Sequence, residues 1–116
     1  MSPEGLNRTA AGRGRSQAPV FAALGDETRL LIVTKLAAGR PCSISHLTSG
    51  TRLSRQAVTK HLRVLENAGI VRGRRTGRES LFAFNPERIE EMRAYLAFIS
   101  EQWDQALARL QSFVER

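Results

Sequence analysis

Polar and basic side chains recur at helical spacing between residues 54 and 63. Arginine, lysine and glutamine match the edges of guanine and adenine, and serine or threonine hydroxyls suit phosphate oxygens. A solvated helix face would also be polar, but so many such side chains at the start of one helix favour contact with nucleic acid. The residues that form this face are Ser54, Arg55, Gln56, Thr59, Lys60 and Arg63.

A second basic feature is a glycine turn surrounded by arginines. Residues 71–75 and 78–84 contain strand-forming side chains on either side of Thr76-Gly77, which predicts a two-stranded hairpin. Its tip carries Arg74, Arg75 and Arg78. Because arginine is almost never fully buried without a partner, this tip is expected to face a polyanion such as the DNA backbone.

The positive charge of the chain is concentrated around these two features. The formal net charge is +7, and residues 51–85 contain eight Arg or Lys against two acidic residues. Basic residues clustered on one part of a domain are typical of nucleic-acid-binding proteins. The sequence therefore predicts a polyanionic partner.

The two histidines and the single cysteine form no catalytic or metal-binding pattern. His61 lies next to the buried face of its helix, so packing or capping fits its position as well as DNA contact does, and His46 is expected to be structural or exposed. Cys42 alone excludes an internal disulfide and a thiolate-rich metal site. We expect no metal, no cofactor and no enzymatic activity, since no glycine-rich phosphate loop or catalytic triad is present either.

Capping residues predict the helices that position the basic face. Three helices are expected, each opened by a capping residue and closed by a glycine, and these pairs are Asp26 with Gly39, Ser43 with Gly50, and Ser54 with Gly69. In the third helix Val58, Leu62 and Leu65 recur at spacings of four and three and are expected to be buried. The last two helices have helix-turn-helix spacing.

The N-terminal residues differ in composition from the rest of the chain. Residues 1–18 are rich in glycine, serine, proline and arginine, so we expect a disordered basic tail and no secretory signal. Residues 19–116 are predicted to form one domain. No stretch approaches the roughly 20 apolar residues of a membrane helix, and we expect a cytoplasmic protein without membrane contact.

The C-terminal residues predict one long amphipathic helix. It begins at Pro86, has no later proline or glycine, and would be roughly 45 Å long. Its apolar residues alternate at spacings of three and four, as in a coiled coil. They could pack within the same chain, but the length of the helix favours a second copy, so residues 86–115 are predicted to be a dimerisation helix. The predicted seam contains Ile89, Met92, Leu96, Ile99, Trp103, Ala106, Leu110 and Phe113.

The order of these motifs resembles that of the ArsR family of bacterial winged-helix repressors. The matching segments are AALGDETR at residues 22–29, LSRQAVTKHL at 53–62 and LENAGIV at 65–71, followed by the arginine-rich hairpin. The resemblance implies that the helix after the turn enters the major groove, that the hairpin is a wing beside it, and that the first and last helices form a dimer. It therefore adds Val20, Phe21 and Leu24 to the dimer interface and keeps His61 as a candidate DNA contact.

Some members of that family sense metals, and here the sequence departs from them. Thiolate sensors have two cysteines on the helix before the recognition helix, where this chain has only Cys42. Other sensors use histidines on the last helix, where this chain has acidic residues but no histidine. Because zinc usually takes nitrogen or sulfur ligands, metal sensing is not expected.

We therefore predict a mainly α-helical fold, a dimeric winged helix-turn-helix with about five helices and a two-stranded hairpin. The predicted function is that of a sequence-specific transcriptional repressor that binds an inverted repeat in double-stranded DNA as a homodimer. The alternatives are a winged-helix adaptor for other proteins and a non-specific nucleic-acid-binding protein. The sequence predicts neither the operator nor any small-molecule effector.

Overall fold

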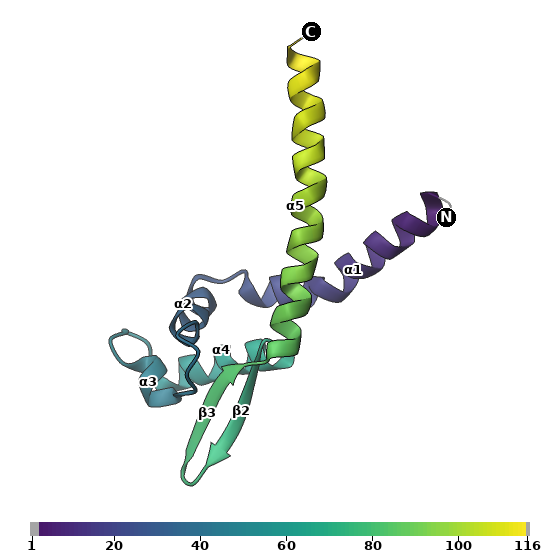
Figure 1. The fold of residues 1–116 in the computed structure, drawn as a ribbon. Helices are drawn as coiled ribbons and strands as arrows, with labels where there is room; N and C mark the ends of the chain where they lie inside the picture. Colours follow the sequence, from purple (N-terminus) through teal and green to yellow (C-terminus); the bar gives the residue numbers. More distant parts are fainter. Residues whose placement is uncertain (1–2, 116) are drawn as a thin grey trace.

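The computed structural model describes residues 3–115, which form a winged helix-turn-helix body with two projecting helices (Figure 1). This confirms the predicted fold class. Within the described residues the elements in chain order are α1 (Pro3–Leu24), α2 (Glu27–Leu36), β1 (Cys42–Ser43), α3 (Ile44–Thr48), α4 (Arg55–Asn67), β2 (Val71–Thr76), β3 (Glu79–Phe84) and α5 (Pro86–Val114).

The three predicted capping residues open the helices of the helix-turn-helix body. The side chains of Asp26, Ser43 and Ser54 each accept a hydrogen bond from the backbone amide three residues later, at 2.9 to 3.1 Å. These bonds satisfy amides that have no partner within their own helix. The predicted starts of α2, α3 and α4 are therefore confirmed.

The recognition helix α4 ends in a glycine cap. Gly69 has a φ of 81°, a conformation that glycine adopts without steric cost. Its amide donates to the carbonyl of Glu66 at 2.9 Å, and the amide of Ile70 donates to the carbonyl of Leu65 at 3.0 Å. Both bonds are those of a Schellman motif, and the buried side chains of Ile70 and Leu65 supply its usual apolar contact. The chain therefore turns sharply from α4 into the wing.

The sheet has three antiparallel strands in the order β1-β3-β2. The sequence predicted only the hairpin, because the two-residue strand β1 is defined by its pairing with β3, where Cys42 lies opposite Phe82. The turn is also one residue later than predicted. Thr76 pairs with Glu79, so the turn consists of Gly77 and Arg78, and Gly77 has a φ of 63°. Glycine at the first position of a two-residue hairpin is the type II′ pattern.

One hydrophobic core holds the body together. It includes the three predicted α4 side chains, and it also includes Val20 of α1, whose exposed fraction is 0%. The assignment of Val20 to a dimer interface was therefore wrong, because a fully enclosed side chain offers no surface to a partner. The buried apolar residues are Val20, Ala23, Ile32, Leu36, Cys42, Leu47, Val58, Leu62, Leu65, Ile70 and Val71.

Helix α1 is longer than the sequence predicted. Residues 3–18, assigned above to a disordered tail, are helical. The later part of this segment contacts α5, where Gln17 is buried and the Arg13 guanidinium lies 4.7 Å from the centre of the Phe98 ring. Pro19 lies inside the helix, where proline removes one backbone hydrogen bond. Contacts with α5, which composition alone does not reveal, favour the helix despite this cost.

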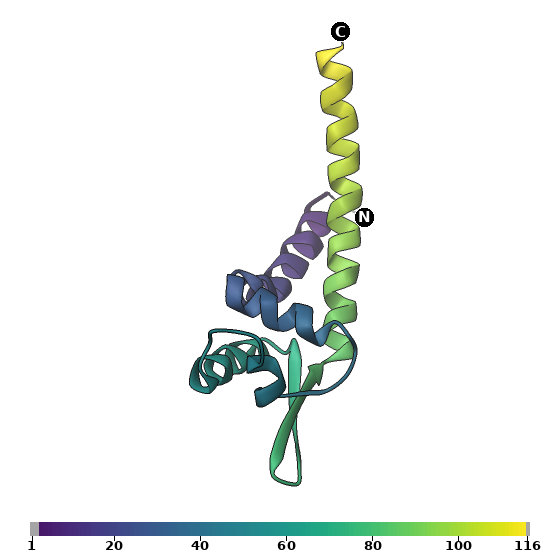
Figure 2. The same ribbon diagram turned by 90° about the vertical axis from the view of Figure 1, so that its left-hand side faces the viewer.

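Helix α5 extends far beyond the body. It has 29 residues and begins with Pro86 at its first turn, as predicted. Figures 1 and 2 show its C-terminal half extending away from every other described element. The radius of gyration is 18.5 Å, against the roughly 13 Å expected for a compact chain of this length. The described part of the chain has no helix long and apolar enough to cross a membrane.

Candidate nucleic-acid interface

The outer face of α4 carries the predicted basic and polar side chains. Val58, Leu62 and Leu65 face the core. The opposite face forms one open hollow on the surface, lined by Arg55, Gln56, Thr59, Lys60 and Arg63. Since these side chains begin at the N-terminus of the helix, its free amides and positive dipole end lie beside them.

The hydroxyl group of Ser54, which caps α4, and that of Thr59 within α4 have different hydrogen bonds. Ser54 accepts from the amide of Ala57 at 3.1 Å, so its own proton remains available to a phosphate oxygen. Thr59 donates its proton to the carbonyl of Arg55 at 2.7 Å. Its methyl group is therefore better suited to the apolar contact with thymine than its hydroxyl is to a phosphate. Ser54 and Thr59, which the sequence suggested alike as phosphate contacts, therefore differ in whether the hydroxyl proton is available.

His61 does not line this hollow. Its Nδ1 lies 3.2 Å from Nη1 of Arg29 and 3.7 Å from Oδ2 of Asp26, both on the α2 side of the body. These contacts fit the interpretation of His61 as a packed residue. They do not fit its interpretation as a DNA contact. Arg29 also donates to the carbonyl of Ala23 in α1. The side chains of Asp26, Arg29 and His61 therefore connect α1, the start of α2 and the middle of α4. The sequence gives no signal for this connection.

The carboxyl group of Asp26 is perturbed by this arrangement. The backbone amide of Arg29, which donates to it, lowers the pKa of Asp26 below its ordinary value of 3.8. Desolvation acts in the opposite direction, and the Arg29 guanidinium and His61 again lower the pKa. The helix cap is therefore strongest when Asp26 is ionised.

The arginines of the wing are exposed. Arg74 and Arg75 lie on β2 and Arg78 lies in the turn, and within the described residues none of the three forms an ion pair with a carboxylate. Arg78 and Arg55 line one small hollow between the wing and the start of α4, together with Glu79 of the wing and residues 43–45 at the start of α3. The two predicted basic features therefore form one continuous surface.

The base of the wing is fixed to α4 by a residue that the sequence did not indicate. A carboxylate oxygen of Glu66, in the last turn of α4, accepts from the amide of Gly73 at 3.0 Å. Arg72 lies 3.9 Å from Glu87 of α5, but both side chains are largely exposed, so this pair contributes little. The Glu66 bond therefore adds a contact with α4 to the pairing of β3 with β1 that already holds the wing.

The comparisons with known proteins agree with this geometry. Residues 26–72 match the family model described as bacterial regulatory protein, arsR family. YuzN of Bacillus subtilis, an HTH-type transcriptional regulator, is 37% identical over 79 residues, which cover 63% of this chain and 86% of YuzN. The chain belongs to the ArsR family. It is a DNA-binding transcriptional regulator of the winged helix-turn-helix class.

Two solved structures show the same fold as this ArsR-family regulator. The ArsR-like transcriptional regulator from Rhodococcus sp. RHA1 superposes with a TM-score of 0.71 at 35% identity, over 88% of this chain and 95% of that one. The winged helix-turn-helix domain Mb0332 from Mycobacterium bovis, described as homodimeric, has a TM-score of 0.61 at 23% identity, over 82% of this chain and 84% of that one. The winged helix-turn-helix architecture is therefore common to all three.

The predicted dimer residues of this ArsR-family protein fall into two groups. Leu24, Ile89 and Met92 pack partly against the core of their own chain, so only part of their surface remains for a partner. Phe21 also has an internal neighbour, the ring of Tyr95, with ring centres 5.9 Å apart. The remaining predicted residues lie further along α5, where Ile99 is half-buried and the exposed ones are Leu96, Trp103 and Leu110.

Cys42 and His46 of the regulator lie close to β1. Cys42 is buried, and its Sγ lies 3.4 Å from the carbonyl of Arg40. His46 is exposed on α3, and its backbone amide donates to the Ser43 cap. Among the side chains that the structure describes, in residues 12–115, no three of His, Cys, Asp or Glu lie close enough together to hold a metal ion.

Proposed function

We propose that this ArsR-family regulator is a homodimeric repressor that binds an inverted-repeat operator. The observation that carries the proposal is the continuous basic surface formed by α4 and the wing. In this proposal Gln56 and the cations that line the α4 hollow contact base edges, and the exposed wing arginines contact the flanking phosphates. We expect repression because a protein bound across a promoter blocks access to it.

The exposed half of α5 supports the homodimer. Trp103 and Leu107 are each 63% exposed and Phe113 is 74% exposed, on the C-terminal half of α5, which no other described element covers. Exposed apolar residues at coiled-coil spacing are usually covered by another helix. The homodimeric state of the related Mycobacterium bovis domain also supports this arrangement.

A dimer of this kind has a defined DNA geometry. Two copies of α4 related by two-fold symmetry would enter successive major grooves, about 34–36 Å apart, on the same side of the duplex. The symmetry of the protein then requires an inverted repeat in the DNA. Such a regulator acts where the chromosome lies, so we propose that it is cytoplasmic. We also propose that it has no enzymatic activity.

Selection of bound genomic fragments, followed by footprinting, tests the proposal. We expect a discrete protected site that contains an inverted repeat. With about six to ten phosphate contacts per dimer, the affinity should fall roughly 10³- to 10⁵-fold between 50 and 200 mM salt. A nearly flat salt response would contradict the assigned role of the wing arginines.

The same experiment separates the proposal from its alternatives. A non-specific nucleic-acid-binding protein would show steep salt dependence but no discrete protected site. A protein-interaction adaptor would bind neither selected nor random fragments. Transcription from a promoter that contains the selected site should fall when the regulator is added, and a rise would show an activator instead.

A further inference from the structure

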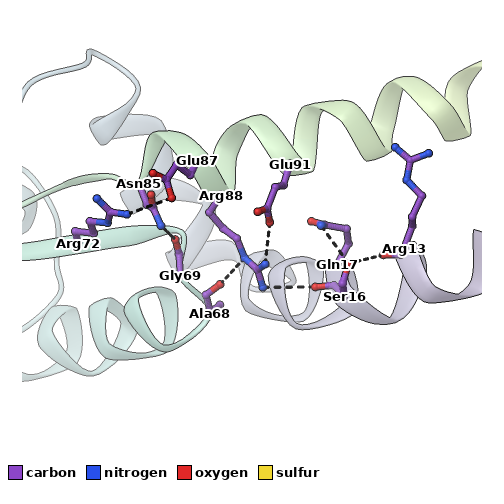
Figure 3. Close-up of polar contacts among 10 residues, drawn as sticks. All are labelled: Arg13, Ser16, Gln17, Ala68, Gly69, Arg72, Asn85, Glu87, Arg88 and Glu91. Carbon is purple, nitrogen blue, oxygen red and sulfur yellow. Dashed lines mark hydrogen bonds and ion pairs between the residues drawn. The ribbon is translucent and has the colours of Figure 1, made fainter. Parts of the chain in front are cut away.

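At the start of α5, the side chains of Asn85 and Arg88 donate to backbone carbonyls that directly follow the recognition helix (Figure 3). The Arg88 Nε donates to the carbonyl of Ala68 at 3.2 Å, and the side-chain amide of Asn85 donates to that of Gly69 at 3.0 Å. The backbone amide of Asn85 donates to the carbonyl of Ile70 at 2.9 Å. The carbonyl of the C-cap residue Ala68 has no partner within the helix, so Arg88 supplies a donor that α4 lacks. The amide bond of Asn85 continues the pairing of β2 with β3, in which Val71 lies opposite Phe84.

Arg88 also connects α4 and α5 to a third helix. One Nη donates to the carbonyl of Ser16 in α1 at 3.5 Å, and the other donates to the carboxylate of Glu91 at 3.0 Å (Figure 3). The planar guanidinium holds its donors in a fixed fork, which allows one side chain to reach three acceptors in different directions. Only 27% of the Arg88 side chain is exposed. The bond to Ala68 is partly buried, whereas the bonds to Ser16 and Glu91 lie at the surface.

The Arg88 side chain packs directly over Gly69. A Cβ atom added at position 69 would lie 3.4 Å from Nε of Arg88 and 3.6 Å from its Cγ, which is ordinary van der Waals contact. Glycine is required there by the positive φ that ends α4 and not by Arg88. The Arg88 side chain therefore lies in contact with the turn that follows the recognition helix.

We infer that Arg88 is a positioning residue for sequence-specific DNA binding, which fixes the direction of α4 relative to α5. This inference rests on the proposed homodimer. If α5 joins the two copies, the angle between α4 and α5 sets the distance and rotation between the two recognition helices. Arg88 itself contacts α1, α5 and the far end of α4, away from the hollow that α4 presents to DNA.

Operator spacing gives a readout that a loss of stability alone would not change. One base pair inserted between the half-sites moves them apart by roughly 3.4 Å and rotates them by roughly 35°. A rigid dimer should lose about tenfold or more in affinity on the inserted operator. A dimer in which α4 is held less firmly against α5 should bind the original operator more weakly. It should also discriminate less between the original operator and the operator with the inserted base pair.

Arg88→Ala and the matched control Arg93→Ala test this inference. Arg93 also lies on α5 and pairs with a glutamate three residues away, Glu90 at 3.3 Å, but both of those side chains are largely exposed. Full-length variants would be titrated on the selected operator, on its one-base-pair insertion and across a salt series. For Arg88→Ala we expect affinity for the original operator to fall about tenfold and the penalty for the insertion to shrink to about twofold.

The other variants should behave differently. Arg93→Ala should keep the wild-type penalty for the insertion, and the salt slope of Arg88→Ala should match that of the wild type, because Arg88 contacts no phosphate. Arg88→Lys keeps the charge but lacks the planar fork, so it should resemble Arg88→Ala. It also carries the test if Arg88→Ala does not fold.

Two failures are distinguishable. If the wild type protects no discrete site, the proposed function is wrong and this inference falls with it. If a protected site exists, and every Arg88 variant that folds retains the full wild-type penalty for the insertion, the inference alone is overturned.

Discussion

The carboxylate of Glu66 accepts a hydrogen bond from the backbone amide of Gly73 at 3.0 Å, which joins the last turn of α4 to the wing. The approach is close because position 73 has no side chain. A Cβ atom there would lie 2.8 Å from the ring of Phe82 and 3.0 Å from the Glu66 carboxylate. The wing and the recognition helix are therefore held together at a point that only glycine fits.

Gly73→Ala should destabilise the protein by about 1–3 kcal/mol, because the added methyl group overpacks this contact. Urea denaturation would measure the change. Gly12→Ala is the control, since a Cβ there meets nothing within 4 Å and alanine is the better helix former in α1. Equal stability of Gly73→Ala and wild type would show that Phe82 and Glu66 move aside freely.

Gln56→Ala and Arg75→Ala should weaken DNA binding in different ways. Gln56 lies on the α4 face, so its loss should cost about 1–3 kcal/mol mainly on the selected operator. Arg75 lies on the wing, so its loss should weaken operator and random DNA to a similar extent and lower the salt slope by about one. Anisotropy titrations on both DNAs would measure this. Equal losses on random DNA for both variants would contradict the proposed division of roles.

Leu96→Glu should separate the dimer, because an unpaired carboxylate buried in a helix interface is strongly unfavourable. Operator binding should be lost with it. Ile99→Glu should act in the same way, and sedimentation at several concentrations would measure both. Gln105→Glu is the control, because residue 105 is exposed and lies on the opposite side of α5. Dimers of normal stability in both seam variants would place the interface elsewhere.

The stability of the protein should depend on the ionisation of Asp26. The folded state lowers the pKa of this carboxyl below 3.8, so it favours the charged form. The resulting stabilisation is complete above about pH 4 and is lost as the pH falls further, through the folded-state pKa. Asp26→Asn retains an oxygen for the Arg29 amide but cannot ionise. The difference in unfolding free energy between wild type and Asp26→Asn should therefore shrink in acid. A difference that stays constant down to about pH 2.5, well below the ordinary pKa of aspartate, would contradict a stabilising role for the Asp26 carboxylate.

Stoichiometric zinc, cadmium or arsenite should leave operator affinity within about threefold, because a closed site needs about four nitrogen or sulfur ligands. Cys42 and His46 lie near β1, whereas His61 lies against Arg29 and Asp26. Operator titrations with and without each metal, repeated on Cys42→Ser, would measure the effect. A tenfold loss that disappears in the variant would identify Cys42 as a ligand.

The sequence predicted the elements that local chemistry determines. Capping side chains at 26, 43 and 54 and the glycine at 69 each act within a few residues, so the helix boundaries of the body follow from them. The face of α4 also follows, because helical spacing separates Val58, Leu62 and Leu65 from the basic side chains. The assignment of those side chains to bases or phosphates stays a prediction.

The features that the sequence did not predict depend on contacts between distant residues. The later part of the helix over residues 3–18 packs on α5, and the composition of this segment alone resembles a flexible tail. Val20 shares the helical spacing of an interface residue, and only the packing of α1 on the body shows that it is enclosed. The bonds of Arg88 join residues 16, 68 and 88, a combination that no local pattern indicates.

Trp103 is the only tryptophan in the chain, and it lies on the exposed face of α5. Indole emission shifts to shorter wavelength when water is removed from the ring, so the protein contains its own optical probe of whether this helix is covered. Dilution of unlabelled protein should move the emission maximum to longer wavelength at the concentration where the two copies separate. The same signal would report any other protein that covers α5, without a change to the surface under study.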